Sequence, residues 1–462
     1  MYDVIIVGAG PAGIFTALEL VKDEKMSVLI LEKGPDIDKR KCPAMDGSIC
    51  RRCEPCQLLS GWGGAGAFSD GKITISTEVG GWLNEYIREE ELKQTMSYVD
   101  SIYLKFGAPR ELHGLDEDLV RDMQRKAVRA DLRLIPQKVR HLGTENCMNI
   151  LKKMKQYLEK LVEIRTNTEV KRIIVEAGRA VGVETADGTV ERSRYVVVAP
   201  GRAGAEWLRR EADRLGLKTL NNPVDVGVRV EVPAETTKEL TDALYEPKLL
   251  YYSKSFDDVV RTFCFAPYGF VITESHDGVI TVNGQSYAYK RSENTNFAIL
   301  VSTAFTEPFK DPISYGKYLA RLTNLLSGGV IVQRLGDLIA GRRSTPDRIR
   351  RSVVKPTLEG ATPGDLSFAM PYRYLTDIRE MLQAMNKLAP GVYSKHTLLY
   401  GIEVKFYSSR IELSNKLETR IKNLFAIGDG AGITRGLMQA SISGVIAARE
   451  IKKRESETRR PD

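Results

Sequence analysis

The sequence predicts an α/β protein in which a discontinuous domain, built from both ends of the chain, is interrupted by a β-rich α+β domain. Three observations support this prediction: a βαβ pattern at the N-terminus, a strand–glycine–helix pattern near the C-terminus, and a β-rich stretch between them. A length of 462 residues suffices for two or three packed units. With 42% apolar and 28% charged residues, the composition is that of a folded globular protein and excludes a disordered or collagen-like chain.

The N-terminal pattern begins with a β-branched run at 2–7, which is typical of a doubly buried parallel strand. Apolar residues then recur at helical spacing from 14 to 21, and a second strand is expected at 27–31. Between the first strand and the helix lie Gly8, Gly10 and Gly13, in the context of a dinucleotide fingerprint. The first glycine permits a tight turn, the second lets the backbone approach a pyrophosphate, and the third packs helix on strand. Glu32 ends the second strand, where an acid binds ribose hydroxyls.

The remaining elements follow in order along the chain. Residues 34–81 are loop-rich, residues 82–160 are mostly helical and basic, strands are expected at 169–176, 180–185 and 193–199, and a β-rich pattern follows from 221 to 389. A last strand ends at Ile427, before a glycine loop and a helix at 437–451. We therefore predict a discontinuous domain from 1–81, 161–220 and 390–455, a mainly helical insertion at 82–160, and a substrate domain at 221–389.

The glycine loop near the C-terminus distinguishes FAD from NAD. The sequence Gly428-Asp429-Gly430 before a helix resembles the second FAD fingerprint of the glutathione-reductase-like flavoproteins. Tyr195 to Gly201 resembles their middle motif, with Pro200 in place of the usual Thr, and Thr168 to Val170 occupies the position where that family clamps the adenine side. Three motifs in this order favour a Rossmann-type FAD-binding domain.

A more specific resemblance covers most of the chain. The stretch from Ser60 to Lys72, preceded by cysteines, is similar to a signature of a widespread bacterial and archaeal group of FAD-dependent dehydrogenases, which residues 140–146 and 401–403 also fit. The chain departs from that group at 404–407 and at 265–266. The resemblance implies hydride transfer between flavin N5 and a small-molecule substrate. The implied cofactor-binding residues are Gly8, Gly10, Ala12, Gly13, Glu32, Lys33, Gly63, Gly64, Ala65, Gly66, Val170, Ala199, Gly201, Gly428, Asp429 and Gly436.

The second glycine loop supplies the candidate catalytic residues. In the wider superfamily this loop passes beside the isoalloxazine ring, so Ser69, Asp70 and Lys72 are the candidates to reach N5 or the substrate. A lysine there would stabilise the negatively charged reduced flavin through its own charge. The alternative is a structural turn with a solvated Lys72.

Four cysteines fall within fifteen residues: Cys42, Cys50, Cys53 and Cys56. Part of their spacing resembles the tight cysteine runs of iron–sulfur proteins, and four thiolates would equally hold a zinc ion. Because the run leads into the flavin-side loop, an iron–sulfur cluster there would pass single electrons to the flavin. The alternative is four reduced thiols or a labile disulfide.

The net charge of the chain indicates the charge of the partners to be expected. Lys plus Arg exceeds Asp plus Glu by 68 − 60 = 8, which favours anionic partners. The densest basic patch could bind a phosphate or carboxylate substrate or be a solvated cluster; it comprises Arg342, Arg343, Arg348, Arg350 and Arg351. Electrons are expected from NAD(P)H, as a transient visitor, or from a ferredoxin.

Two other functional classes stay open. A tRNA-modifying flavoprotein would fit the basic charge, although nucleic acid is not the expected partner, and a non-catalytic FAD-bound partner protein would fit the cofactor motifs alone. No N-terminal run resembles a signal peptide, and no stretch approaches the ~18 apolar residues of a membrane span. A cytoplasmic location is therefore expected.

Overall fold

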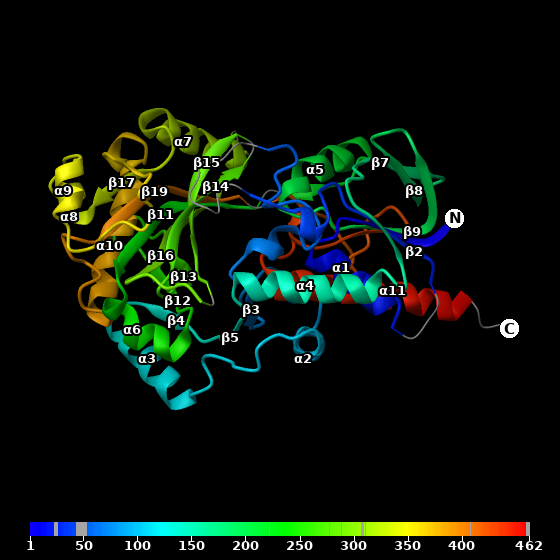
Figure 1. Ribbon diagram of the computed structural model, residues 1–462, viewed down its shortest axis with the longest axis horizontal. Coiled ribbons are helices and arrows are strands. Elements are labelled where there is room, and N and C mark those ends of the chain that lie inside the picture. Colours follow the sequence, from blue (N-terminus) through cyan, green and yellow to red (C-terminus); the bar gives the residue numbers. More distant parts are fainter. Residues whose placement is uncertain are drawn as a thin grey trace. The chain divides into compact units, whose positions relative to one another are not determined.

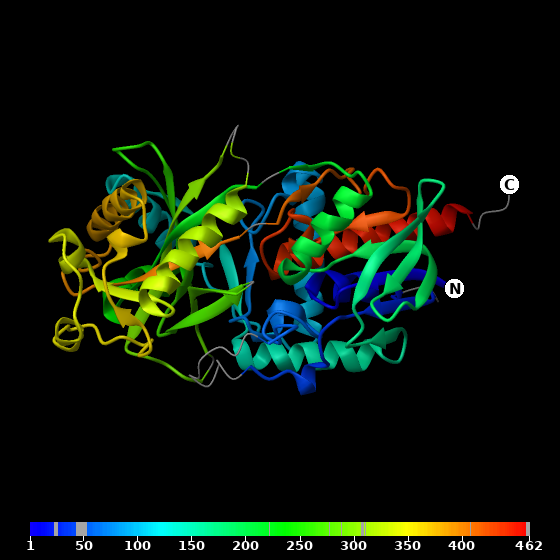
Figure 2. The same ribbon diagram turned by 90° about the horizontal axis from the view of Figure 1, so that it is seen from above.

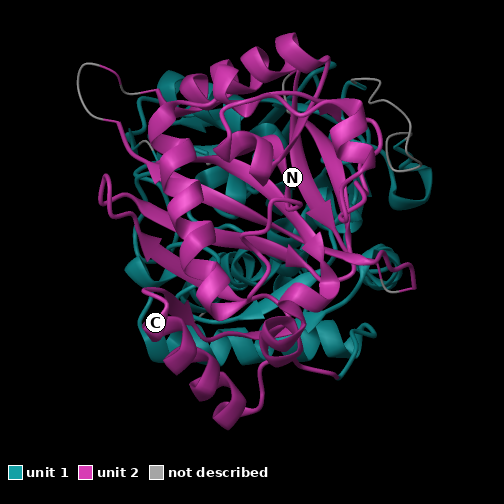
Figure 3. Cartoon of the chain, turned by 90° about the vertical axis from the view of Figure 1, so that its left-hand side faces the viewer, with its two compact units in different colours: residues 1–110, 140–222, 407–462 teal, residues 111–139, 223–406 magenta. Residues whose placement is uncertain are grey.

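The computed structural model describes residues 1–22, 26–42, 53–220, 222–276, 278–287, 289–305, 309, 311–406 and 408–458. The chain has a mixed α/β fold and divides into two compact units (Figure 3). Unit 1 comprises residues 1–110, 140–222 and 407–462, and unit 2 comprises residues 111–139 and 223–406. Each unit has its own apolar core.

Unit 1 is built on a parallel sheet in the order β6-β2-β1-β9-β21. The first half of β9 also pairs with β8 in an antiparallel ribbon that continues to β7. The strands are β1 (Tyr2–Val7), β2 (Val28–Leu31), β6 (Glu163–Arg165), β7 (Val170–Glu176), β8 (Arg179–Thr185), β9 (Val190–Val198) and β21 (Leu424–Ala426), with β3 (Lys72–Ile75), β10 (Thr219–Leu220) and β20 (Arg410–Ile411) outside this sheet. The whole of β2 and the part of β1 from Val4 to Val7 are buried, and both are continuous apolar runs because both of their faces are covered.

The helices of unit 1 bring the two ends of the chain together. The helix after the first glycine loop lies beside the last helix of the chain (Figures 1 and 2), so closely that a Cβ on Gly444 would lie 2.2 Å from the Ala12 carbonyl oxygen. These two are α1 (Pro11–Leu20) and α11 (Leu437–Thr458); the others are α2 (Glu89–Lys105), α4 (Thr144–Leu158) and α5 (Ala205–Arg214). The discontinuous domain is thus a single packed unit.

Unit 2 is built on a largely antiparallel sheet in the order β18-β17-β19-β11-β16-β13-β12-β4. The strands are β4 (Arg133–Ile135), β11 (Val224–Pro233), β12 (Lys248–Tyr252), β13 (Val259–Ala266), β16 (Asn294–Thr303), β17 (Ile331–Arg334), β18 (Thr362–Pro363) and β19 (Leu398–Lys405), with the hairpin β14 (Phe270–His276) and β15 (Val279–Gln285). Its helices are α3 (Glu117–Arg129), α6 (Ala234–Leu244), α7 (Pro312–Ser327), α8 (Leu335–Ile339), α9 (Pro346–Arg350) and α10 (Tyr372–Leu388). One boundary between the two units, between residues 139 and 140, falls within β5 (Lys138–His141).

Two of the predicted domain boundaries differ from these units. The expected helical insertion at 82–160 is divided, because 82–110 and 140–160 pack in unit 1 and 111–139 in unit 2. Residues 390–406, expected in the discontinuous domain, belong to unit 2 because β19 pairs with β11 and β17. Pairing of β4 with β12 places 111–139 in unit 2, whereas the apolar faces of α2 and α4 pack in the core of unit 1.

Candidate functional site

Three loops at the carboxyl ends of parallel strands meet in unit 1. They follow β1, β9 and β21, and they contain the first, middle and C-terminal motifs. A Cβ on Gly8 would lie 2.2 Å from the Ala199 carbonyl oxygen, and one on Gly430 would lie 2.7 Å from that of Gly201. The carboxyl ends of parallel strands are where open α/β sheets bind ligands.

The second glycine loop packs against the first. The Gly63 N–H donates to the Ala9 carbonyl at 2.7 Å, and the loop continues as a 3₁₀ turn, Gly64–Phe68, that contains Ala65. A Cβ on Gly66 would lie 2.9 Å from the Leu437 side chain at the start of α11. The two glycine loops and the α11 N-terminus are therefore neighbours in unit 1.

Glu32 joins these loops through its carboxylate. It accepts hydrogen bonds from the N–H groups of Ala9 at 2.9 Å and of Gly34 and Gly61 at 2.8 Å, and it is 6% exposed. A carboxylate has about four lone-pair positions, so one remains for another donor. From the sequence, Glu32 is expected to bind a ribose, and this role stays a prediction. Its three hydrogen bonds show that it also holds the two glycine loops together.

Gly10 and Gly436 are glycines that the protein's own packing does not require. Neither has a positive φ. Among the described atoms, the nearest to a Cβ on Gly10 would be the Gly64 Cα at 3.9 Å, and none lies within 4 Å of a Cβ on Gly436. By contrast, a Cβ on Gly13 would lie 2.0 Å from the Gly8 carbonyl oxygen. Both open positions fit a ligand that approaches the backbone closely.

Asp429 lies at the turn after β21. Burial raises the pKa of its carboxyl, whereas Arg202, at 4.0 Å, and the Thr434 hydroxyl, which donates to it at 2.6 Å, act in the opposite direction. A backbone hydrogen bond from Gly436 also lowers this pKa, and a carboxylate with about four lone-pair positions keeps room for a further donor.

Two further predicted cofactor contacts, Lys33 and Val170, lie near Glu32 in the fold. The Lys33 ammonium donates to the Ala203 carbonyl at 3.3 Å. Val170 is buried at the start of β7, and two residues earlier the Thr168 N–H donates to the Glu32 carbonyl at 2.9 Å. The segment expected at the adenine side therefore adjoins Glu32.

Arg40 is a residue that the sequence did not single out. Its buried guanidinium donates to the carbonyl groups of Gln57, Leu58, Trp62 and Gly64 at 2.7–2.9 Å. Burial lowers the pKa of Arg40 to about 10. Its place within the run Lys39 to Lys41 resembles a solvated charge run, so only the structure shows that it holds the second glycine loop.

A stacked pair next to the α11 N-terminus is a second missed feature. The Arg435 guanidinium lies over the Trp82 ring, 3.8 Å from its centroid. The backbone N–H of Arg435 donates to the Gly80 carbonyl at 2.7 Å, and the backbone N–H of Trp82 donates to the Ile433 carbonyl at 2.9 Å. This pairing places a cation beside Gly436.

The candidate catalytic residues form a small polar group at the end of the second glycine loop. Lys72 Nζ and Asp70 Oδ2 are 2.8 Å apart, with side chains only 7% and 12% exposed. The Ser69 hydroxyl donates to the Gly66 carbonyl at 2.9 Å and accepts from the Gly71 N–H at 3.2 Å. Ser69 thus shapes the turn, and Lys72 is a buried, paired ammonium rather than a solvated one.

The cysteine segment is described only in part, since Cys50 lies outside the described residues. Cys53 is exposed, and Cys42 and Cys56 are half-buried. Within the part of the chain that the structure describes, no three His, Cys, Asp or Glu side chains are grouped to hold a metal ion. The three described cysteines therefore do not by themselves fit a cluster or a zinc ion.

Two members of the arginine patch in unit 2, Arg342 and Arg348, lie beside a buried acid. Asp337, fully buried, accepts from Arg334 at 2.9 Å, Arg342 at 3.0 Å and the Ser344 hydroxyl at 2.8 Å, and Arg348 lies 3.9 Å away. Burial alone raises the pKa of Asp337, but these hydrogen bonds outweigh it and lower the pKa to about 2. Part of the patch is thus an internal ion-pair network.

This network predicts a stability effect with a defined pH dependence. Because the pKa of Asp337 falls from 3.8 to about 2 on folding, its stabilisation is present above pH 3.8 and is lost as the pH falls through 2. Asp337→Asn should lower the free energy of unfolding by about 2 kcal/mol at pH 7. Urea unfolding would measure it, with the exposed Asp347→Asn as the matched control. Equal stability of the Asp337 variant and wild type at pH 7 would contradict this prediction.

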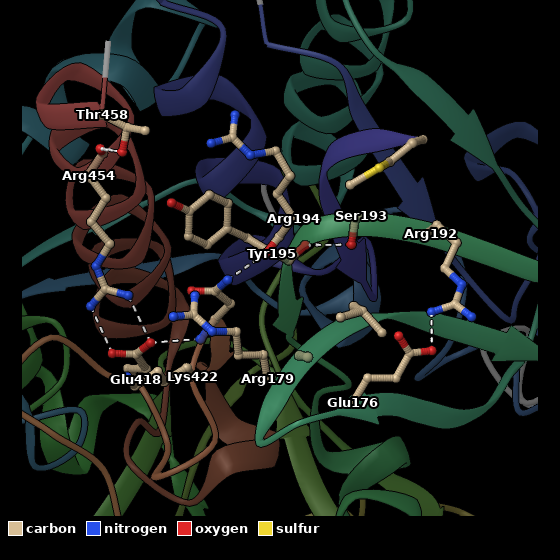
Figure 4. A pocket seen from close by; sticks show the side chains of 14 residues that line it. Glu176, Arg179, Arg192, Ser193, Arg194, Tyr195, Glu418, Lys422, Arg454 and Thr458 are labelled. Carbon is tan, nitrogen blue, oxygen red and sulfur yellow. Dashed lines mark hydrogen bonds and ion pairs between the residues drawn. The ribbon is translucent and has the colours of Figure 1, made fainter. Parts of the chain in front are cut away.

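A cavity of about 820 Å³ opens at the other end of the unit 1 sheet (Figure 4). It is lined by residues at the amino ends of β9 and β21, and two of its arginines pair with lining acids, Arg192 with Glu176 and Arg454 with Glu418. Because the glycine loops follow the carboxyl ends of these strands, the cavity is separate from the candidate cofactor site.

Comparison with known proteins gives one family match. Residues 223–406 match the family described as "FAD-dependent protein, C-terminal domain-like". This range coincides with the longer segment of unit 2. Over 474 aligned residues, the chain is 26% identical to an uncharacterized protein of Clostridium beijerinckii, covering 97% of this chain and 80% of that protein.

Two solved structures are among those that match the chain at low identity. Quinol fumarate reductase of E. coli matches with a TM-score of 0.44 and 13% identity, covering 100% of this chain and 71% of that chain. A geranylgeranyl bacteriochlorophyll reductase-like protein of Thermoplasma acidophilum matches with a TM-score of 0.44 and 14% identity, covering 99% and 79%. Among the residues described, no helix is long and apolar enough to span a membrane.

Proposed function

We propose that the chain is an FAD-dependent oxidoreductase that transfers a hydride between a small-molecule substrate and the flavin. The observation that carries the proposal is the pair of open glycine positions, Gly10 and Gly436, beside the second glycine loop. No contact among the described residues of unit 1 explains them, whereas a dinucleotide lying against the backbone would. The family match of residues 223–406 supports FAD as that dinucleotide.

The residues of unit 1 would divide the binding task. The first turn of α1, which has no side-chain cap at Gly10, would present its N–H groups to the pyrophosphate. Glu32 would accept a ribose hydroxyl through its remaining lone pair, and Asp429 would accept from the ribityl region. When bound, FAD supplies a hydride acceptor and donor at N5. The turn held by Arg40 and Glu32 would keep the second glycine loop rigid against the ring.

The function is tested by purification without oxygen. We expect flavin absorbance with a near-stoichiometric amount of released FAD, and bleaching by dithionite. Protein that carries no flavin and shows no affinity for added FAD would contradict the proposal. Flavin that is reduced and reoxidised by no tested electron partner, NAD(P)H and ferredoxin included, would favour a non-catalytic FAD protein instead.

Replacing Lys72 or Asp70 should shift the midpoint potential of the flavin in opposite directions. Lys72→Met removes a cation that would stabilise the reduced flavin, so the midpoint potential should fall by on the order of 30 mV, equivalent to about 1.4 kcal/mol for a two-electron couple. Asp70→Asn leaves the Lys72 ammonium without its counter-charge and should raise the midpoint potential. Equilibrium dye titration measures both, with the exposed Lys93→Met as the control. Unchanged potentials in both variants would make the pair purely structural.

The cysteine segment gives a separate prediction. If Cys42, Cys50, Cys53 and Cys56 jointly hold an iron–sulfur cluster, anaerobic protein should contain iron and acid-labile sulfide in near-stoichiometric amounts. Zinc would instead be colourless and redox-silent. Cys53→Ser should lose the metal and keep FAD, which is held elsewhere. Protein with neither iron nor zinc would leave the thiols as redox-active or structural residues.

A further inference from the structure

Helix α7 has an apolar side that the core of unit 2 does not use. The helix packs against β15 and β19 (Figure 1), and the buried residues on that side are Pro312, Gly316, Leu319, Ala320 and Thr323. A second apolar row runs beside this buried side at the spacing i, i+3, i+7 and i+10: Tyr315, Tyr318, Leu322 and Leu325, with Leu326 next to it. Residues at this spacing share one side of a helix. The apolar arc of α7 is therefore wider than its contact with the core.

Much of this second row is exposed to solvent. Its exposed members, with their exposed fractions, are Tyr318 (65%), Leu326 (48%) and Leu325 (82%). At the N-terminal end of the row, the ring of Tyr315 lies 4.9 Å from that of Phe305, and Phe305 lies 5.1 Å from the exposed ring of Phe309. Single exposed apolar residues are ordinary, whereas several neighbouring ones indicate a surface that another apolar phase covers.

The charged residues of α7 are all basic. They are Lys317 and Arg321, one turn apart on the polar side, and the helix contains no Asp or Glu. Arg321 is exposed, lies one turn before Leu325, and forms no ion pair among the described residues. The nearest carboxylate in the sequence, Asp311, precedes the helix and accepts from the N–H and the hydroxyl of Ser314 at 3.0 and 2.6 Å. The exposed apolar row is therefore flanked by cations of the same helix.

These charges decide which partner fits the exposed row. A second copy of the helix would bring further cations and no carboxylate to this flank, so two copies would repel each other. A bilayer that contains anionic lipids would instead take up the leucine side chains and neutralise the cations at its headgroups. Tyr318 suits the boundary between headgroups and acyl chains, because its ring is apolar and its hydroxyl is polar.

We propose that α7 docks the protein on the surface of an anionic membrane, with Leu325 and Leu326 inserted among the lipids and Arg321 beside their phosphates. The helix would lie in the plane of the interface, since its 16 residues are too few to span a bilayer and one side is buried in unit 2. This interaction goes beyond the proposed oxidoreductase function and requires no cofactor.

The test is sedimentation of the purified full chain with extruded vesicles. Vesicles of phosphatidylcholine mixed with anionic phosphatidylglycerol should bind the protein at least about tenfold more tightly than vesicles of phosphatidylcholine alone. Binding should weaken as the salt concentration rises, because salt screens the cations. Leu325→Gln, which retains a good helix former, should weaken binding by about tenfold or more, and Arg321→Gln by about fivefold.

Two matched controls remove similar side chains elsewhere in unit 2. Val128→Gln replaces an exposed apolar residue of α3, and Arg343→Gln lowers the net charge by the same amount as Arg321→Gln. Both control variants should bind anionic vesicles as the wild type does. Equal losses in Leu325→Gln and Val128→Gln, or in the two arginine variants, would overturn the assignment to α7.

The other outcomes are equally decisive. No binding, or equal binding to the two kinds of vesicle, would overturn the proposal and leave the flavoprotein function standing. A wild-type dimer that Leu325→Gln converts to a monomer in vesicle-free buffer, as measured by light scattering, would overturn it as well and assign this face to a second copy. If Leu325→Gln melts at a lower temperature than the wild type, Tyr318→Gln takes its place with the same expectation.

Discussion

A Gly10→Val protein is expected to fold and to be purified without FAD. Gly10 has φ −80°, and the nearest atom to a Cβ there would be the Gly64 Cα at 3.9 Å. The protein alone therefore has room for a Cβ at this position, whereas a pyrophosphate that approaches the backbone would leave none. FAD content should fall by more than about tenfold, equivalent to about 1.4 kcal/mol of binding free energy. Absorbance of the purified protein and its melting temperature measure the two effects.

Two other glycines, Gly13 and Gly360, show what a substitution does where no cofactor is expected to be the cause. Gly13→Ala places a Cβ 2.0 Å from the Gly8 carbonyl oxygen, so this variant should lose the fold itself rather than the cofactor alone. Gly360→Val is a matched control in unit 2, because nothing lies within 4 Å of a Cβ there. Full FAD content in the Gly10→Val protein would show that no pyrophosphate lies against this loop.

Replacing Glu32 by alanine should cost both stability and cofactor. The change leaves three backbone donors, those of Ala9, Gly34 and Gly61, without their acceptor. Each buried, unsatisfied N–H costs about 1–3 kcal/mol, so the free energy of unfolding should fall by about 3 kcal/mol or more. Because the same bonds join the two glycine loops, FAD affinity should fall with it. Urea unfolding and FAD titration measure the two losses.

Two further variants separate these effects. Glu32→Gln retains one oxygen and should be intermediate in stability. Glu163→Ala, at a half-exposed carboxylate on β6, should change the free energy of unfolding by no more than about 1 kcal/mol. If Glu32→Ala were as stable as Glu163→Ala, the three hydrogen bonds would not hold the loops together.

Local patterns predicted the framework of unit 1. The strands expected at 169–176, 180–185 and 193–199 correspond to β7, β8 and β9, and the helix expected from 437 corresponds to α11. The α/β fold class is confirmed. These elements were predictable because a buried strand is a short apolar run and a helix repeats its apolar positions every three or four residues. The glycine fingerprint was readable for the same reason, since its spacing is local.

The features that were missed depend on contacts between distant segments. Arg40 looks like part of a charge run until its carbonyl partners, seventeen and more positions later, are known. The charged face of unit 2 is also invisible locally: in β11 the alternation of valine and charged residues predicts one solvated face, yet Asp225, Arg229 and Glu231 are buried. Burial of that face is set by strands and loops from elsewhere in the chain.

The hydrogen bonds from Arg40 to Gln57 bear on how freely the length of the cysteine segment can change. Arg40 Nε and Nη2 donate to the Gln57 carbonyl at 2.9 and 2.8 Å, and the Lys41 N–H donates to the Gln57 side chain at 2.9 Å. The two ends of the stretch from Cys42 to Cys56 are thus fastened to each other outside the stretch itself. Doubling the length of such a closed loop costs only about 0.6 kcal/mol. Insertions into the stretch should therefore cost little stability, because the bonds between residues 40–41 and Gln57 hold the start of the glycine loop independently of it.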